Sequence, residues 1–227
     1  TYTLFGESHG PCVGIVIDGL PSGLKVDEAY MAKEMAKRRS ISSISTPRRE
    51  EDQIEIWSGV KDGFTEGTPV TLVIRNNNTR SSDYSLLEEI ARPSHAEYTA
   101  EMKYQGYQDV RGGGHFSGRL TAPIVAAGAL VRKALEEKGI FIGTHISRCG
   151  AIEDASFAEE ELLSQITELN EKDFAVLSEE AGKEMIEKIQ EAREENDSVG
   201  GILESVIVGL EAGLGEPAFD SFESLLA

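Results

Sequence analysis

The chain has 227 residues, 40% of them hydrophobic, and a formal net charge of -18 at pH 7. This length and apolar content are enough to form an ordinary buried core. The acidic balance argues against a nucleic-acid partner and against a membrane surface as partner, because both require clustered Lys and Arg.

The cysteines and the chain ends set further expectations. Cys12 and Cys149 are too few for a disulfide scaffold, and neither belongs to a C-x-x-C pair, so we expect a reduced, cytoplasmic setting. No apolar stretch reaches the roughly 20 residues that a membrane helix needs. The chain starts at Thr1, and residues 220–227 look helical without a stop signal, so we expect the natural chain to be longer and truncated here at its C-terminus.

Strands are predicted where apolar runs are bounded by Gly and Pro. These runs lie at residues 14–18, 53–57, 70–74, 140–145 and 202–210. The first helix is predicted to begin after Asp27, a good N-cap, and to bring Arg38 and Arg39 together in its last turn. Its apolar stripe consists of Met31, Ala32, Met35 and Ala36.

Three later helices are predicted. One covers residues 121–138, with Pro123 in its first turn, alanines through its middle and Gly139 as its stop. The next begins at Ser156, where S-F-A-E is a capping box. Its apolar face would consist of Leu162, Leu163, Ile166 and Leu169. The last covers residues 178–193.

The order of elements favours an α+β fold class. The strands and helices lack the regular alternation and the G-x-G-x-x-G turn of a dinucleotide-binding fold. We expect a single domain over residues 1–227. Residues 156–196 are crowded with Glu and Asp and are expected to form an acidic helical excursion with a solvated face.

Two short polar motifs each carry a histidine. FGESHG at residues 5–10 places His9 between glycines that let the backbone approach a ligand, and RPSHAEY at residues 92–98 places His95 near Arg92 and Pro93. An imidazole in such a turn can act as a general acid or base near neutral pH. The alternative is that both histidines only satisfy backbone groups in turns.

The stretch DVRGGGHFSGR at residues 109–119 is the most informative. Three successive glycines would expose backbone N–H groups beside Arg111 and Arg119, at the start of the alanine-rich helix, which is how a protein holds phosphate. No G-K-[ST] follows, so an NTPase is disfavoured. A flexible hinge is the alternative.

Other polar segments are assigned smaller roles. Residues 45–50 (STPRRE), with Arg38 and Arg39, form a basic loop that could grip carboxylates or phosphates, or simply be solvated surface. Residues 76–83 are predicted to form a polar turn, from which Arg80 and Asp83 could reach a site. No metal-ligand set is predicted, and His145 is interpreted as a structural histidine.

Five strings, in order and with compatible spacing, resemble the motifs of the chorismate synthase family. They are FGESHG at 5–10, RPSHAEYTAEMKY at 92–104, DVRGGGHFSGR at 109–119 with the LTAPIVAAGALVRKAL that follows, ENDSVGG at 195–201 and GLGEPAFD at 213–220. The resemblance runs the length of the chain. It implies an α+β fold of the chorismate synthase type, a β-α-β sandwich with mixed sheets around central helices.

The resemblance also implies an activity. Members of the family are carbon–oxygen lyases that convert 5-enolpyruvylshikimate 3-phosphate to chorismate and phosphate by a 1,4-anti elimination. This reaction is the last common step of the shikimate pathway to the aromatic amino acids. It depends on reduced FMN (FMNH2), and bifunctional members reduce their own flavin with NADPH. A homotetramer is implied.

Site residues are carried over from the same resemblance. His9 would donate a proton to the departing phosphate, and His95 would balance charge on the reduced flavin. The implied substrate contacts are Ser8, Arg38, Arg92, Ser117 and Arg119. The implied cofactor contacts are His115, Phe116, Ser117 and Arg38.

Three departures from the family pattern leave alternatives open. His115 stands where many members have arginine, residues 40–44 are shorter and less basic than the usual loop, and the family's C-terminal part, with further site residues, is absent. One alternative is therefore an inactive remnant or assembly module that keeps the fold. Another is a phosphatase-like hydrolase, which the glycine loop and His9 would support but which lacks an evident nucleophile.

Overall fold

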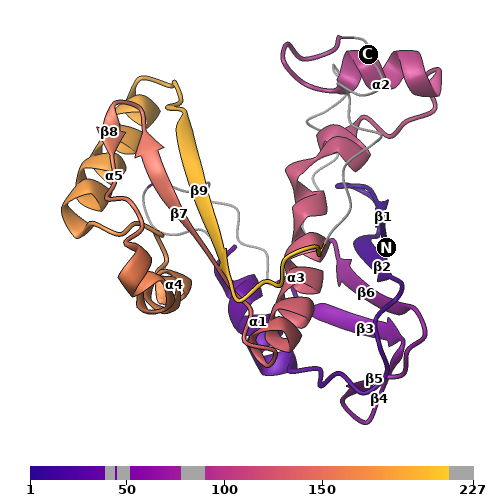
Figure 1. Cartoon of the computed structure of the whole chain (residues 1–227). Coiled ribbons are helices and arrows are strands. Elements are labelled where there is room, and N and C mark those ends of the chain that lie inside the picture. Colours follow the sequence, from indigo (N-terminus) through magenta and orange to yellow (C-terminus); the bar gives the residue numbers. More distant parts are fainter. Residues whose placement is uncertain (39–43, 45–51, 78–89, 215–227) are drawn as a thin grey trace. The chain divides into compact units, whose positions relative to one another are not determined.

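The computed structural model describes residues 1–38, 44, 52–77 and 90–214 (Figure 1). The chain divides into two compact units, Thr1–Ala134 with Ile189–Ser198, and Leu135–Lys188 with Val199–Ala227. We call them unit 1 and unit 2. Helices and strands occur in both, which confirms the α+β class. The expectation of a single domain over residues 1–227 stays a prediction.

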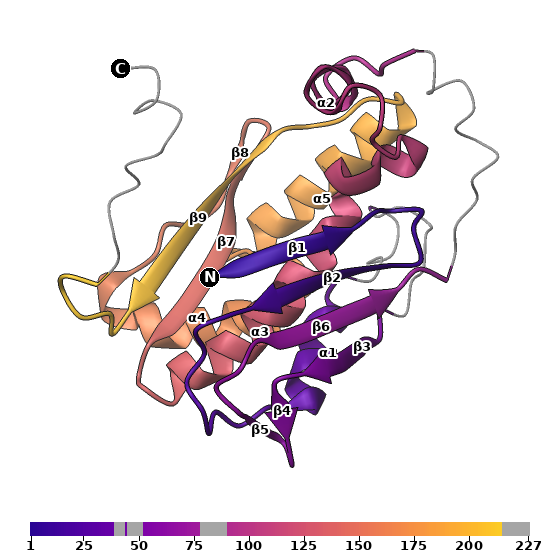
Figure 2. The same cartoon turned by 90° about the vertical axis from the view of Figure 1, so that its right-hand side faces the viewer.

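Unit 1 is built on a four-stranded sheet in the order β1-β2-β6-β3 (Figure 2). Its strands are β1 (Tyr2–Gly6), β2 (Cys12–Ile17), β6 (Val70–Arg75) and β3 (Ile54–Ser58), and all three pairings are antiparallel. A small hairpin, β4 (Val60–Lys61) and β5 (Phe64–Thr65), lies between β3 and β6 in the sequence. The sequence predicted β2, β3 and β6 but missed β1, whose first residues are exposed and so lack an apolar signal.

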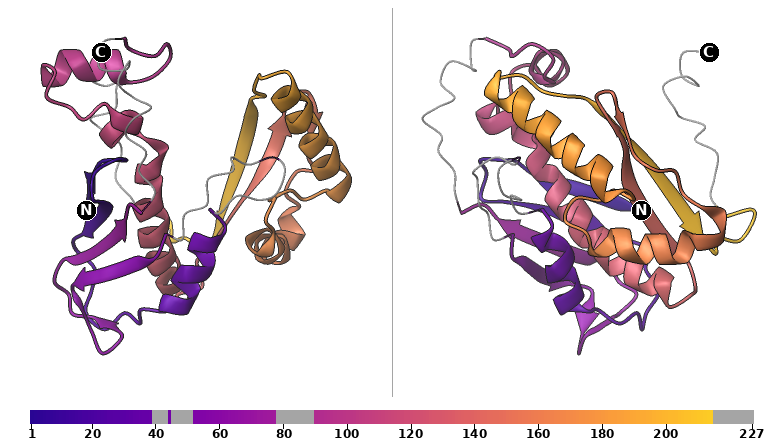
Figure 3. Two further views of the ribbon diagram at one scale, coloured as in Figure 1. Left: turned by 180° about the vertical axis from the view of Figure 1, so that it is seen from behind. Right: turned by 90° about the vertical axis from the view of Figure 1, so that its left-hand side faces the viewer.

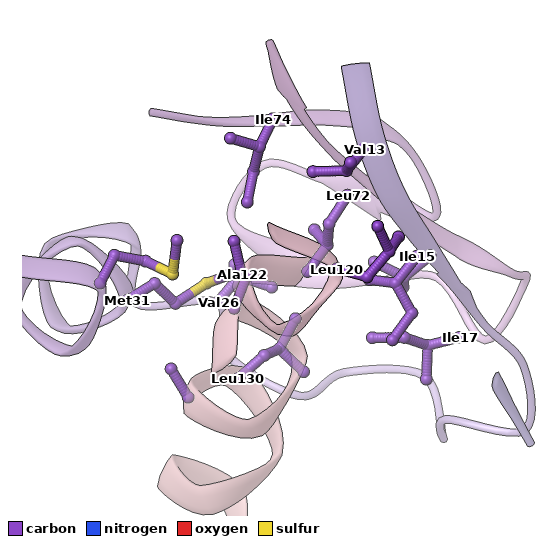
Figure 4. Packing of buried hydrophobic residues seen from close by; sticks show 14 residues of the cluster. Val13, Ile15, Ile17, Val26, Met31, Leu72, Ile74, Leu120, Ala122 and Leu130 are labelled. Atoms are coloured by element: carbon purple, nitrogen blue, oxygen red, sulfur yellow. The ribbon is translucent and has the colours of Figure 1, made fainter. Parts of the chain in front are cut away.

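Two helices complete the core of unit 1. Alternate residues of β2 and β6 and one face of α3 (Thr121–Glu136) form a continuous buried cluster, which α1 (Glu28–Ala36) extends with Met31 and Met35 (Figure 4). Ala126 and Ala129 are buried on α3, as expected for a helix that packs closely through small side chains. The short helix α2 (Glu97–Tyr104) also belongs to this unit.

Unit 2 contains a three-stranded antiparallel sheet in the order β8-β7-β9. Its strands are β7 (Phe141–Cys149), β8 (Ile152–Glu153) and β9 (Gly201–Val208). Helix α4 (Leu162–Glu171) packs on β7, where Gly143 makes room for Ile166 (Figure 3). Helix α5 (Glu179–Glu194) follows and buries Met185. The acidic region therefore has apolar residues in the core of unit 2, as well as its exposed Glu-rich face.

Three details of the predicted helices were wrong. Helix α1 ends at Ala36, so Arg38 lies just beyond its C-cap Lys37, and Arg39 lies outside the described residues. Ala32 and Ala36 are exposed, because only Met31 and Met35 face the core. Helix α4 begins at Leu162, not at Ser156, and Leu163 is exposed.

The late start of α4 has a tertiary cause. The ring of Phe157 packs edge-on against the buried ring of His145, with 4.8 Å between centroids, and this contact draws the segment into unit 2 in a non-helical conformation. His145 itself is a satisfied structural histidine, as predicted. Its Nδ1 lies 2.7 Å from Asp154 Oδ2 and its Nε2 lies 2.9 Å from Glu204 Oε2.

Asp154 is expected to make unit 2 sensitive to acid. Burial alone would raise the pKa of this carboxyl, but the N–H groups of Leu177 and Ser178 and the ring of His145 more than offset this, so the pKa lies below its ordinary value of 3.8. The resulting stabilisation is present above pH 3.8 and is lost as the pH falls through the lower folded pKa.

We therefore predict that Asp154→Asn lowers the free energy of unfolding at neutral pH by about 3 kcal/mol, because it removes a buried charge from a hydrogen-bonded network. Below pH 3.8 the difference from wild type should shrink. Urea unfolding as a function of pH measures both effects. Asp173→Asn, at an exposed position of the same segment, is the control. Equal stability of the Asp154 variant and wild type at neutral pH would contradict the prediction.

Candidate functional site

His9 lies in a tight turn between β1 and β2. Gly6 ends β1 with a φ of +92°, and a Cβ there would lie 2.2 Å from the carbonyl oxygen of Cys12, so only glycine fits. The turn that follows buries both polar side chains: Ser8 is 1% exposed and His9 is 8% exposed. The N–H of Ser8 donates to the carbonyl of Gly114 at 3.0 Å, which ties the turn to the glycine loop.

The three glycines at 112–114 make room for the two histidines. All three have positive φ values of 59°, 83° and 53°. A Cβ on Gly112 would lie 2.2 Å from the His9 ring, and a Cβ on Gly113 would lie 3.1 Å from the His95 ring. Both imidazoles therefore contact the same short loop, although they are far apart in the sequence.

One expectation for the glycine loop needs correction. The N–H of Gly113 is not exposed for a ligand, because it donates to the carbonyl of Val110 within a tight 3-10 turn. The positive charge of Arg111 is paired, since its Nη2 lies 2.7 Å from Asp109 Oδ2, and this contact holds the pKa of Asp109 below its ordinary value.

Arg92 and His95 lie together, as the motif predicted, and share a carboxylate that the sequence analysis missed. Arg92 Nη2 lies 3.4 Å from His95 Nε2, and Arg92 Nε donates to Glu97 Oε1 at 2.7 Å. His95 Nδ1 lies 3.5 Å from the same oxygen. Burial favours a higher pKa for Glu97, but the hydrogen bonds from Arg92 prevail and lower it. Glu97 is therefore a buried, ionised carboxylate that is held in place beside Arg92 and His95.

Arg119 and Arg38 meet at Asp52, a second carboxylate that the sequence analysis did not single out. Asp52 accepts from Arg119 Nη1, and its other oxygen lies 3.5 Å from Arg38 Nε. Arg38 also donates to the hydroxyl of Thr121 at 2.8 Å. The side chains of Arg119 and Asp52 are 7% and 8% exposed. Two guanidiniums share one carboxylate here, so these three groups carry a net positive charge that suits an anion.

Asn76 connects this cluster to the His9 turn. In the sequence it belongs to a predicted polar turn, but in the structure its Nδ2 donates to the carbonyls of Glu7 and Gly10, both at 2.9 Å. Its Oδ1 accepts from Arg119 Nε at 3.0 Å. The sequence signal was weak, because a lone asparagine after a strand is ordinary turn composition.

His115 and Phe116 line a pocket of about 440 Å³ to which Gly6 and Glu7 of the same turn also contribute. Its walls also include Phe5, Glu7, Tyr104, Tyr107 and Asp109. His115 Nδ1 lies 2.9 Å from the carbonyl oxygen of Gly6, and Phe116 is half-exposed with its ring 6.1 Å from that of Tyr104. Aromatic faces of this kind suit a flat ring system.

Every site residue that the family resemblance implies lies in unit 1. The structure brings His9, Ser8 and His95 onto the glycine loop, pairs Arg92 with His95, and joins Arg38 to Arg119 through Asp52. Ser117 is engaged locally, since its hydroxyl accepts from the N–H of Arg119 at 3.3 Å. Some positions singled out in the sequence lie outside the described residues. They are Arg39, Arg48, Arg49, Arg80, Asp83 and residues 215–220 of the last motif.

Two negative findings apply to the part of the chain that the structure describes. Within it, no three His, Cys, Asp or Glu side chains come together as metal ligands. Among its helices, none combines the length and the apolar character needed to cross a bilayer.

The fold and this cluster define a class: an α+β protein that gathers histidine, arginine and carboxylate side chains around one glycine loop and the turn beside it. Comparison with known proteins identifies the family. The family model "Chorismate synthase" matches residues 1–227. Chorismate synthase of Pyrococcus abyssi is 46% identical over 227 residues, which is 100% of this chain and 62% of that protein. Chorismate synthase of Methanosarcina barkeri is 43% identical over 226 residues, 99% of this chain and 61% of that protein.

A solved structure agrees. A crystal structure of chorismate synthase matches with a TM-score of 0.68 at 30% sequence identity, covering 91% of this chain and 56% of the solved chain. The chain therefore belongs to the chorismate synthase family. It spans 62% of the length of its Pyrococcus relative.

Proposed function

We propose that the complete protein is a chorismate synthase, which eliminates phosphate from 5-enolpyruvylshikimate 3-phosphate with the help of reduced FMN. The observation that carries the proposal is the packing of His9 and His95 against adjacent glycines of one loop, in the same unit as the buried Arg119 and the partly exposed Arg92 and Arg38. An elimination that releases phosphate needs a proton donor at the leaving group and cations that hold it, and these are the groups present.

His9 is assigned to the leaving phosphate. It is nearly buried, next to Ser8, on the turn that Asn76 connects to Arg119. We propose that Arg119 and Arg38 bind the anionic groups of the substrate and that the Ser8 hydroxyl donates a hydrogen bond to them. The substrate would compete with Asp52 for the guanidiniums. His9 would then pass a proton to the phosphate as its bond to carbon breaks.

His95 and Arg92 are assigned to the other side of the loop. Arg92 is held by Glu97 through its Nε and Nη2 atoms, so its position is set before any ligand binds. This preorganisation reduces the entropy lost on binding an anion. His95, against Gly113, would balance negative charge on the reduced cofactor, as the family resemblance implies.

The aromatic pocket beside His115 fits the flavin on chemical grounds. Phe116, Tyr104 and Tyr107 offer rings for a flat isoalloxazine system, and His115 offers a polar edge. We propose His115 and Phe116 as flavin contacts, with Ser117 and Arg38 as further contacts by resemblance. Reduced FMN, when bound, would supply an electron or a base to the substrate.

The test uses the complete natural protein under anaerobic conditions. We expect phosphate release from 5-enolpyruvylshikimate 3-phosphate with dithionite-reduced FMN and none with oxidised FMN. Release that does not depend on flavin would overturn the elimination and favour a hydrolase. No release under either condition would favour an inactive remnant of the fold.

Three finer points are proposals from the family resemblance. We propose a cytoplasmic homotetramer, and NADPH as the flavin reductant if the protein is one of the bifunctional members. Native mass spectrometry would give the subunit number, and flavin reduction by NADPH in the absence of dithionite would identify the reductant.

A further inference from the structure

We infer that Asn76 is a positioning residue that joins the proton donor to the anion-binding arginines. The inference rests on the proposed function, in which His9 protonates the phosphate that Arg119 helps to bind. Asn76 touches neither imidazole in the contacts described above; it acts through the turn that carries His9 and through the Arg119 guanidinium.

Both the nitrogen and the oxygen of the Asn76 side-chain amide are engaged. Both donations of its Nδ2 go to the ends of the His9 turn, to the carbonyl of Glu7 and to the carbonyl of Gly10. Its oxygen accepts from Arg119. The backbone N–H of Asn76 also donates to the carbonyl of Pro11 at 3.1 Å, which fixes the asparagine against the same loop. The hydrogen bonds from Asn76 therefore hold the turn that carries Ser8 and His9 at both of its ends.

The same residue sets the orientation of Arg119. With Nε held by Asn76, the guanidinium plane is fixed, its Nη2 reaches the carbonyl of Arg75 at 3.3 Å, and its Nη1 reaches Asp52. Asp52 in turn contacts Arg38. The turn that carries the proton donor and both arginines thus belong to one hydrogen-bonded network, so a shift of the turn changes the distance between acid and anion.

Asparagine is the residue type that this position requires. Aspartate has the same size and can still accept from Arg119, but it cannot donate, so it would face the carbonyls of Glu7 and Gly10 with like partial charges. The substitution therefore separates the two halves of the role, because it releases the turn and keeps the arginine.

The experiment is a double-mutant cycle in the complete protein with reduced FMN. We expect Asn76→Asp to lower kcat by about 10- to 100-fold, the size expected for a misplaced catalytic group. In the His9→Ala background the same substitution should change kcat by less than about 3-fold, because residues that act as a unit are not additive. A rise in KM caused by the added charge near Arg119 is expected in both backgrounds.

Asn77→Asp is the matched control, since it adds the same charge at the neighbouring, exposed position. It should leave kcat within about 2-fold of wild type. An equal fall in kcat for Asn76→Asp in both backgrounds would mean a merely structural role and would overturn the inference. A kcat equal to the wild-type value in Asn76→Asp would also overturn the inference. Asn76→Ser, which is shorter and neutral, replaces the aspartate variant if that does not fold.

A second measurement does not depend on activity. Diethyl pyrocarbonate modifies accessible imidazoles, and peptide mass spectrometry gives the rate for each histidine. In Asn76→Asp the rate at His9 should rise several-fold, whereas the rate at His145 should not change. An unchanged rate at His9 would overturn the inference even in an active enzyme. If the wild-type protein releases no phosphate, the proposed function fails, and this measurement still decides whether Asn76 holds the turn.

Discussion

Replacement of His9 by alanine is expected to slow phosphate release by a factor of about 100 or more, the usual cost of losing a general acid. The reason is geometric. His9 is buried against Gly112 in a turn fastened by Ser8 and Asn76, and alanine has no group that could donate a proton from that position. Steady-state phosphate release with reduced FMN measures the effect.

The His9 variant needs a comparison that separates chemistry from folding. Alanine at this position removes a nearly buried ring, so the melting temperature of the variant is measured alongside its rate. The main effect should fall on kcat, because the arginines proposed to bind the substrate remain. A wild-type rate in a folded His9→Ala protein would leave His9 as an ordinary turn residue and would remove the proposed proton donor.

His95→Ala is expected to have a comparable effect of about 100-fold. Its cause would differ, because His95 lies with Arg92 and the ionised Glu97 and is assigned to the cofactor rather than to the leaving phosphate. The variant should also bind reduced FMN more weakly, which fluorescence or absorbance titration measures. Normal turnover with normal flavin binding would contradict the role assigned to His95.

Gly112→Ala is a third change for which we predict a large effect. The added methyl would lie 2.2 Å from the His9 ring, and residue 112 has a φ of +59°, where alanine is strained. The backbone strain alone costs about 1–3 kcal/mol. Relief of the clash must move His9 or the loop, so we expect turnover to fall by about 100-fold, as for other displacements of a catalytic group by about 1 Å.

Gly118→Ala is the matched control in the same motif. A Cβ at Gly118 meets nothing within 4 Å, and its φ is not in the left-handed region. This variant should keep the wild-type rate and stability. If Gly112→Ala and Gly118→Ala behave alike, the glycine loop does not hold His9, and its glycines serve another purpose such as flexibility.

The secondary structure was predictable where it depends on local pattern. The strands β2, β3, β6, β7 and β9 and the helices α1, α3 and α5 follow apolar periodicity, caps and stops, and Asp27 caps α1 as expected by accepting from the N–H of Tyr30. The start of α4 was wrong, because the contact between Phe157 and His145 outweighs the local capping signal at Ser156. That contact joins residues from separate elements, and no local rule detects it.

The site residues also fall into two groups, those that a local motif predicted and those that only the fold brings together. Arg92 and His95 were predicted to lie together, because they occupy one short motif with a fixed backbone. Asp52 and Asn76 were missed, since each acts on partners more than 40 residues away in the sequence, such as Arg119. Their neighbours in the sequence look like ordinary polar turns, which gives no sign of the partners that the fold supplies.

The sequence by itself determined the elements, the α+β class and the motifs that resemble one family, because periodicity, caps and short strings are local properties. The tertiary structure decided that His9 and His95 contact adjacent glycines of one loop, that Asp52 sits between Arg38 and Arg119, and that Asn76 links the arginines to the turn. These contacts depend on which strands pair and which helices cover them. The energy of such long-range packing is not encoded in any single stretch of residues.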